Sequence, residues 1–126
     1  MPLTRVSLIK GKSPEYRRAI LDQVYLAMRE AFGVPEEDRF MILTEHEKND
    51  FVYGADYLGI NRDDDLVMIQ IFANNTRTTE QKKALYARIA ELLKDKPGIK
   101  PENVLISLVE VAKENWSFGL GLAQYA

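Results

Sequence analysis

The chain has 126 residues, enough for one domain, and its 17 basic and 19 acidic side chains include no long basic block, so we expect no nucleic-acid partner. It contains no cysteine, which excludes disulfides, thiol catalysis and thiolate metal sites. No apolar run is long enough to span a bilayer and the first residues do not read as a signal peptide, so we expect a cytoplasmic protein with no membrane partner.

The chain opens with MPLTRVSLIKG, in which a strand-like run over residues 3–9 directly follows Pro2. If Met1 is removed, the nitrogen of Pro2 becomes a secondary amine that acts as a general base when neutral or as a general acid when protonated. While Met1 remains, the same atom is an amide nitrogen without useful basicity. Because many chains begin with Met-Pro, the dipeptide alone leaves a structural and a catalytic interpretation open.

A helix is predicted between Ser13 and Gly33. Ser13 suits the N-cap, Pro14 suits the first helical position, and Gly33 suits a left-handed C-terminal cap. Apolar residues recur at helical spacing along this segment and form the face that we expect to be buried: Ile20, Leu21, Val24, Ala27, Met28, Ala31 and Phe32.

The next apolar run predicts a strand over residues 40–44, with Asp38 and Arg39 directly before it. We expect this strand to lie parallel to the first, joined to it by a right-handed helical crossover. Each charged residue has an ordinary alternative role, a turn residue for Asp38 and a surface ion-pair partner for Arg39.

The segment HEKNDFVYGADYLGINRDDD is long for a connector without structure of its own. A functional lid and an extra surface hairpin are equally good interpretations. We expect its DDD run to be a solvated turn rather than a cation site. His46, the one histidine, is expected in a surface loop, and no second histidine exists to complete a common zinc triad, so no metal is expected.

The second half repeats the pattern of the first at an offset of about 65 residues. It predicts a strand over residues 66–73, a helix that begins with a capping box of Thr78 and Gln81, and a strand over residues 104–111. Gly98 is the counterpart of Gly33 and is expected to cap the second helix in the same way. The buried helical face consists of Leu85, Ile89, Leu92 and Leu93.

Together these elements predict an α+β fold for the single domain 1–126, with pseudo-repeats at about 2–45 and 66–111. Two β-α-β units form a four-stranded mixed sheet with both helices on one face. The strands are nearly continuous apolar runs, which are typical of strands that are buried on both faces. Since two helices cover only one face, we expect another copy of the chain to cover the other.

An in-plane twofold axis between the halves would gather three chemical groups at one rim of the sheet. Pro2 precedes the first strand, Asp38 precedes the second, and Arg77 follows the third and precedes the second helix. A helix N-terminus adds partial positive charge and free N–H groups, so this rim suits a small carboxylate. Taken alone, Arg77 also has the ordinary reading of a solvated helix-entry residue. No glycine-rich phosphate loop or nucleophile elbow is present, and we expect no cofactor.

Four stretches in order, PLTRVSLIKG, AFGVPEEDRF, NTRTTEQK and ENWSFGLGLAQY, resemble the tautomerase superfamily over nearly the whole chain. Within it the chain looks most like the malonate semialdehyde decarboxylase branch. The resemblance implies a homotrimer with an amino-terminal catalytic proline, here Pro2. It further implies that Asp38 is functional, that Arg77 binds a substrate carboxylate, and that Trp116 and Phe118 form a pocket wall. Ordinary core or interface packing is an equal alternative for these two aromatic residues.

Two departures from the family pattern are visible. Some decarboxylases of this branch carry a second arginine at the position of Asn75. The related cis-3-chloroacrylic acid dehalogenases use a histidine in the first helix, and that helix has none here, which disfavours their activity.

The resemblance therefore implies a small oxo acid as substrate and decarboxylation to acetaldehyde, with keto-enol tautomerase or hydratase activity as related possibilities. The residues alone leave open a non-enzymatic, ferredoxin-like ligand-binding or regulatory module, because such modules share the same order of elements. A trimer with a side tautomerase activity and another physiological role is the third alternative.

Overall fold

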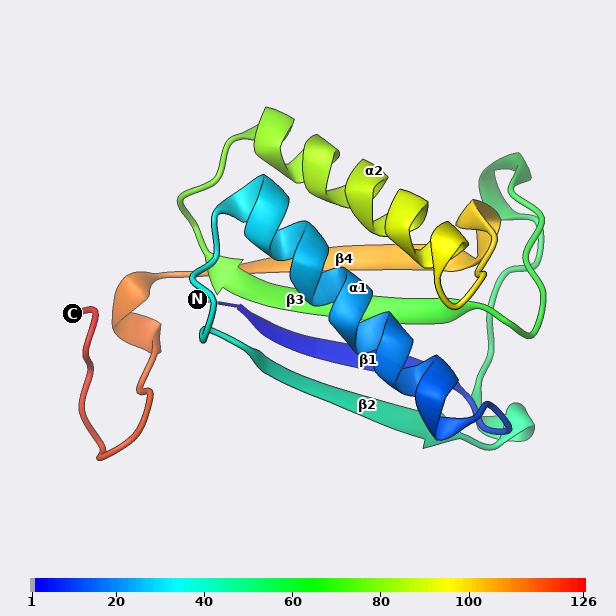
Figure 1. The fold of residues 1–126 in the computed structure, drawn as a ribbon, viewed down its shortest axis with the longest axis horizontal. Helices are drawn as coiled ribbons and strands as arrows, with labels where there is room; N and C mark the ends of the chain where they lie inside the picture. Colours follow the sequence, from blue (N-terminus) through cyan, green and yellow to red (C-terminus); the bar gives the residue numbers. More distant parts are fainter. Residues whose placement is uncertain (1) are drawn as a thin grey trace.

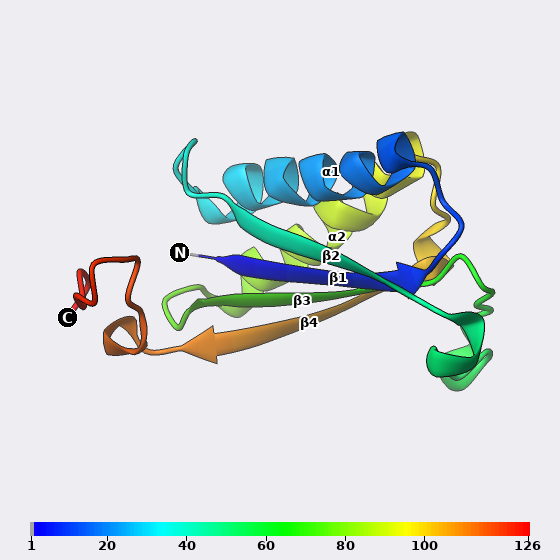
Figure 2. The ribbon, with the colours of Figure 1, turned by 90° about the horizontal axis from the view of Figure 1, so that it is seen from below.

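The computed structural model describes residues 2–126, so the question of whether Met1 is removed lies outside the described residues. Four strands form one sheet in the order β2-β1-β3-β4, and two long helices pack across it (Figure 1). The elements are β1 Leu3–Ile9, α1 Pro14–Phe32, β2 Phe40–His46, β3 Val67–Asn74, α2 Thr79–Asp95 and β4 Val104–Val111. Both helices lie on the same face of the sheet (Figure 2).

The pairing of the strands confirms the mixed sheet and the inverted relation of the two halves. β1 is parallel to β2, and β3 is parallel to β4, whereas β1 and β3 at the centre are antiparallel. In this register Leu3 lies opposite both Phe40 and Phe72. The starts of β1 and β2 therefore lie at the same end of the sheet as the ends of β3 and β4.

The predicted caps of α1 are confirmed. The Ser13 side chain accepts a hydrogen bond from the Tyr16 backbone N–H at 3.1 Å, and Pro14 occupies the first helical position. Gly33 ends the helix in the left-handed conformation with a φ of 64°, a region that costs a residue with a Cβ more than it costs glycine.

The predicted capping box of α2 is also present, but the prediction for its C-terminus was wrong. Thr78 and Gln81 cap each other reciprocally. The helix ends at Asp95 with Lys96 in an extended conformation, and Pro97 follows, which has no N–H with which to continue it. Gly98 does have a positive φ of 101°, but it lies beyond the helix.

The core fills the space between the helices and one face of the sheet. Its fully buried members come from both halves of the chain: Val6, Ile20, Val24, Val67, Ile69, Ile71, Leu85, Ile89 and Leu93. The opposite face of the sheet carries apolar side chains that no part of residues 2–126 covers fully. Phe40 is 51% exposed, Ile42 50% and Leu105 40%, so within a single chain these strands are not buried on both faces.

The segment between the halves is a folded loop rather than a hairpin. It contains two short 3₁₀ turns, and the Arg62 guanidinium donates to the carbonyls of Gly54 and Tyr57 at 3.1 and 3.0 Å. Asn103, at the start of β4, exchanges two hydrogen bonds with Asp63. The loop lies at the end of the sheet opposite to Pro2, so it does not form a lid over the predicted site of its own chain (Figure 1).

The charged and polar residues of this segment have local structural partners. Asp63, Asp64 and Asp65 each pair with a different lysine, at 3.3, 3.0 and 2.6 Å. The prediction that His46 lies in a surface loop was wrong: it is the last residue of β2, because this strand extends two residues beyond Thr44. Its ring lies 5.9 Å from that of Phe51.

No helix formed by residues 2–126 combines the length and the apolar character needed to cross a bilayer.

Candidate active site

Three sequence-predicted residues come to the same end of the sheet because of the strand directions. Pro2 is buried and leads into β1, and Asp38 is half-buried two residues before β2. Arg77 is half-buried in the turn that joins β3 to α2. The segment that follows β4 also lies beyond this end, next to the chain's start (Figures 1 and 2).

The electrostatics of Asp38 reflect this gathering. Burial raises the pKa of the Asp38 carboxyl, and the positive charge of Arg77 acts in the opposite direction. The Asp38 backbone N–H donates to the Pro35 carbonyl at 3.1 Å, which closes the turn that presents the side chain. The Asp38 carboxyl therefore interacts with the positive charge of Arg77 across the rim.

Arg77 is held in place by the end of α1. Its Nη2 donates to the Phe32 carbonyl at 3.3 Å, and its guanidinium lies 4.8 Å from the centre of the Phe32 ring. Nη1 lies 3.5 Å from the hydroxyl of Thr76. A guanidinium has five N–H donors, so these contacts orient the group and still leave donors for an anion. The N-terminus of α2 directly follows and adds its own partial positive charge.

Arg39 is not gathered with these three residues. It forms an ion pair with Asp22 of α1, and its guanidinium lies 4.4 Å from the centre of the Tyr25 ring. The expected surface ion-pair role for Arg39 is correct in kind, with Asp22 as the partner.

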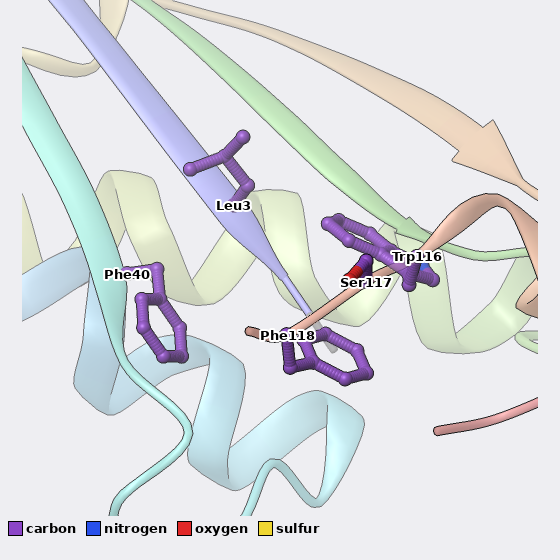
Figure 3. A pocket seen from close by; sticks show the side chains of 5 residues that line it. All are labelled: Leu3, Phe40, Trp116, Ser117 and Phe118. Carbon is purple, nitrogen blue, oxygen red and sulfur yellow. The ribbon is translucent and has the colours of Figure 1, made fainter. Parts of the chain in front are cut away.

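An apolar cavity of about 190 Å³ lies at this end of the sheet. Leu3 and Phe40 line it from the sheet, and Trp116, Ser117 and Phe118 line it from the segment after β4 (Figure 3). Leu3 directly follows Pro2 in the chain, so the cavity adjoins the start of β1. The walls suit a small molecule with an apolar portion.

The aromatic wall of this cavity is itself an ordered stack. The rings of Trp116 and Phe118 are stacked with their centres 5.6 Å apart, and Tyr125 meets Phe118 edge-on at 4.8 Å. The indole Nε1 of Trp116 donates to Oδ1 of Asn74 at 2.7 Å.

Sequence reasoning missed four residues of this region: Leu3, Phe40, Ser117 and Asn74. Alternation along the strands could have found Leu3 and Phe40. Leu3 directly follows Pro2, Phe40 lies two residues after Asp38, and both point away from the helices. Asn74 is a polar residue at the end of an apolar strand, which is a detectable signal, but its partner lies far along the chain.

Among residues 2–126, no three histidine or acidic side chains are grouped so that they could hold a metal ion.

The fold places the chain among α+β proteins built from two inverted β-α-β units, with Pro2, Asp38 and Arg77 at one end of the sheet. Two family models, both described as tautomerase enzyme, match residues 38–119 and 2–61. The chain is 38% identical to the probable tautomerase YusQ of Bacillus subtilis, over 98% of each chain. It is 37% identical to the probable tautomerase YrdN of the same organism, over 99% of this chain and 96% of that one. The chain therefore belongs to the tautomerase superfamily of enzymes.

Solved structures of this superfamily share the fold closely. The chain is 40% identical to the FG41 malonate semialdehyde decarboxylase inhibited by 3-bromopropiolate, with a TM-score of 0.92 over 98% of this chain and 93% of that one. A second malonate semialdehyde decarboxylase, described with decarboxylase and hydratase activities, is 32% identical, with a TM-score of 0.92 over 98% and 95% of the two chains. A fused 4-OT described as a symmetric trimer is 22% identical with a TM-score of 0.80 and shares the fold.

Proposed function

We propose that this chain decarboxylates a small 3-oxo acid of the malonate semialdehyde type, with the nitrogen of Pro2 as its catalytic group after removal of Met1. The observation that carries the proposal is the gathering of Pro2, Asp38 and Arg77 at one rim, beside an apolar cavity. The similarity to two malonate semialdehyde decarboxylases over nearly the whole chain supports the same activity.

In this proposal each group has one task. Arg77 binds the substrate carboxylate through its N–H donors. Protonated Pro2 donates its proton to the aldehyde oxygen, the electrons of the breaking carbon–carbon bond form an enol, and carbon dioxide leaves. The enol then takes a proton from water at carbon and returns its hydroxyl proton to the nitrogen of Pro2, which gives acetaldehyde and restores protonated Pro2. A Schiff base between Pro2 and the aldehyde is the covalent version of the same reaction. Asp38 positions water or tunes Pro2, and Trp116 and Phe118 enclose the apolar part of the substrate.

We further propose that the active form is a homotrimer. The sheet face opposite the helices carries the exposed apolar side chains Phe40, Ile42 and Leu105, which a neighbouring copy would cover. A structural relative with the same fold is described as a symmetric trimer.

Keto-enol tautomerisation is the second candidate function, and the two Bacillus relatives named probable tautomerases favour it. In that reaction neutral Pro2 carries a proton between carbon and oxygen. The two reactions need different protonation states of the same nitrogen. An NMR titration of Pro2 in the mature protein separates them, because a nitrogen that stays cationic well above neutral pH disfavours base-catalysed tautomerisation.

The central test is turnover of malonate semialdehyde and phenylenolpyruvate by protein whose intact mass shows that Met1 is gone. We expect Pro2→Ala to lower kcat about 100-fold or more, because the primary amine of alanine replaces the rigid ring nitrogen. Arg77→Ala serves as the control for substrate binding and should mainly raise KM. Unchanged turnover by Pro2→Ala would contradict the proposal and favour the non-enzymatic, ferredoxin-like module.

A further inference from the structure

We propose that Asn74 is a positioning residue, which accepts a hydrogen bond from Trp116 and thereby holds the aromatic wall of the cavity at a set place relative to Arg77. The inference rests on the proposed function, since it concerns how that site holds an acid. It adds a residue that does not itself touch the substrate.

Asn74 is placed where its side chain needs a partner. It is the last residue of β3 and only 8% exposed, although its amide group is polar. A buried amide group without hydrogen bonds is costly, so such groups are nearly always paired. The 2.7 Å bond from the Trp116 indole to Oδ1 supplies such a pairing across 42 positions of the chain.

The turn that begins at Asn74 is attached to its surroundings at both ends. The Asn75 backbone N–H donates to the Val111 carbonyl at 3.1 Å, which ties the turn to the end of β4. Three residues after Asn74, the guanidinium of Arg77 rests on Phe32 at the end of α1. The same short turn therefore carries both Arg77 and Asn74, the acceptor for Trp116. A movement of the indole that pulls on Asn74 would change the distance between the aromatic wall and Arg77.

This hydrogen bond connects the segment after β4 to the sheet. The hydrogen bonds of Gln124 lie within this segment: its side chain accepts from the Phe118 N–H and donates to the Gly119 carbonyl, each at 3.0 Å. The bond of Trp116 instead crosses from the segment to β3. Phe118 is stacked on Trp116, so fixing the indole also fixes the second aromatic ring of the wall.

The first arm of the test is spectroscopic and needs no turnover. Trp116 is the one tryptophan of the chain, so a single indole N–H resonance and a single emission band report on it. We expect Asn74→Leu, which keeps the size but removes the acceptor, to abolish the exchange protection of that N–H. Asn74→Asp keeps an oxygen at the same place and should retain the protection.

The second arm measures binding of malonate, a small dicarboxylate, by the change in Trp116 emission, together with steady-state kinetics on malonate semialdehyde. We expect Asn74→Leu to weaken malonate binding and to raise KM by about tenfold, because the aromatic wall shifts. We expect kcat to change by less than about threefold, because Pro2, the proposed proton-transferring residue, keeps its place. Trp116→Phe, which removes the N–H donor together with part of the ring area of the wall, should raise KM at least as much. If the partners act through one bond, the double variant should be no worse than Trp116→Phe alone.

The outcomes separate this inference from the proposed function. Malonate binding that weakens in Asn74→Leu supports the inference even if the wild-type protein does not turn over malonate semialdehyde, a result that would overturn the proposed function alone. An indole N–H that stays protected in Asn74→Leu, or effects of the two single variants that add, would overturn the inference. If Asn74→Leu does not fold, a KM of Trp116→Phe equal to that of the wild type overturns it instead.

Discussion

At the scale of single residues, Arg77 is oriented before any ligand arrives. The Phe32 carbonyl and ring hold its guanidinium from the side of α1, so little side-chain freedom remains to be lost on binding. A planar fork of N–H donors held in this way suits a carboxylate with its two oxygens.

Arg77→Lys tests whether the shape of this group matters as well as its charge. The ammonium of lysine keeps the charge but offers no planar pair of donors, and we expect KM for an oxo acid to rise about 10- to 100-fold. Steady-state kinetics measure this, with Arg18→Lys on the exposed side of α1 as a matched exchange of the same residue types. A KM within twofold of the wild type would show that charge alone suffices.

Asp38 gives a prediction for stability against pH. Because burial raises its pKa, the folded chain holds this proton more tightly than the unfolded chain, whose value is near 3.8. The stabilising contribution is therefore complete below that value and is lost as the pH rises through the folded-state pKa. At neutral pH the ionised carboxyl disfavours the fold.

We therefore expect Asp38→Asn to melt at the same temperature as the wild type or higher at pH 7, with the difference shrinking as the pH falls toward 4. Its turnover should drop by at least about tenfold, since the variant no longer carries an ionisable group there. Thermal unfolding followed by circular dichroism over this pH range is the measurement. If the melting temperature of Asp38→Asn, measured relative to the wild type, is lower at pH 7 than at pH 4, the raised pKa of Asp38 is contradicted.

The places of residues in the fold were predictable from sequence where they depend on strand order, and not where they depend on contacts between distant parts of the chain. Strand directions alone brought Pro2, Asp38 and Arg77 to one rim. The bond between Asn74 and Trp116 was not predictable, because it joins β3 to a segment with no regular structure. Periodicity describes the face on which a residue lies, but it does not describe which loop returns to that face.

At the scale of elements, the end of α1 sets the geometry of the turn that leads to Asp38. Gly33 has a φ of 64°, and an added Cβ there would meet no atom within 4 Å, so the requirement for glycine is conformational rather than steric. We expect Gly33→Ala to lower the free energy of unfolding by about 1 kcal/mol, and Gly33→Asn by less, because asparagine tolerates the left-handed region better. Chemical denaturation of the three proteins checks the order, and an alanine variant as stable as the wild type would contradict it.

The two halves also show where an internal repeat stops being a guide. Their N-terminal caps match, with Ser13 and Thr78 in equivalent places. Their C-terminal ends differ, because Pro97 has no counterpart in the first half and ends α2 before Gly98 is reached. A repeat predicts shared elements well, whereas a single proline overrides the local pattern.

At the scale of the whole molecule, we expect the open sheet face to determine the state of assembly. Ile42 is 50% exposed in the middle of β2, and in the proposed trimer this side chain is covered. We expect Ile42→Asp to convert the trimer to monomers, because a buried carboxylate without a partner is costly. Light scattering coupled to gel filtration measures the mass, and Lys83→Asp, which places the same carboxylate on the exposed side of α2, is the control. A trimeric Ile42→Asp variant would place the interface elsewhere.

The inverted arrangement of the halves gives the sheet two ends of similar build, yet an amine at the start of a strand is proposed for only one of them, at Pro2. Val67 stands in the second half where Pro2 stands in the first; it is fully buried, and its nitrogen is an ordinary amide inside the chain. If Met1 is removed, a fold with approximate internal symmetry therefore becomes chemically asymmetric. The opposite end of the sheet, where no reactive nitrogen is proposed, carries the folded loop and its lysine–aspartate pairs.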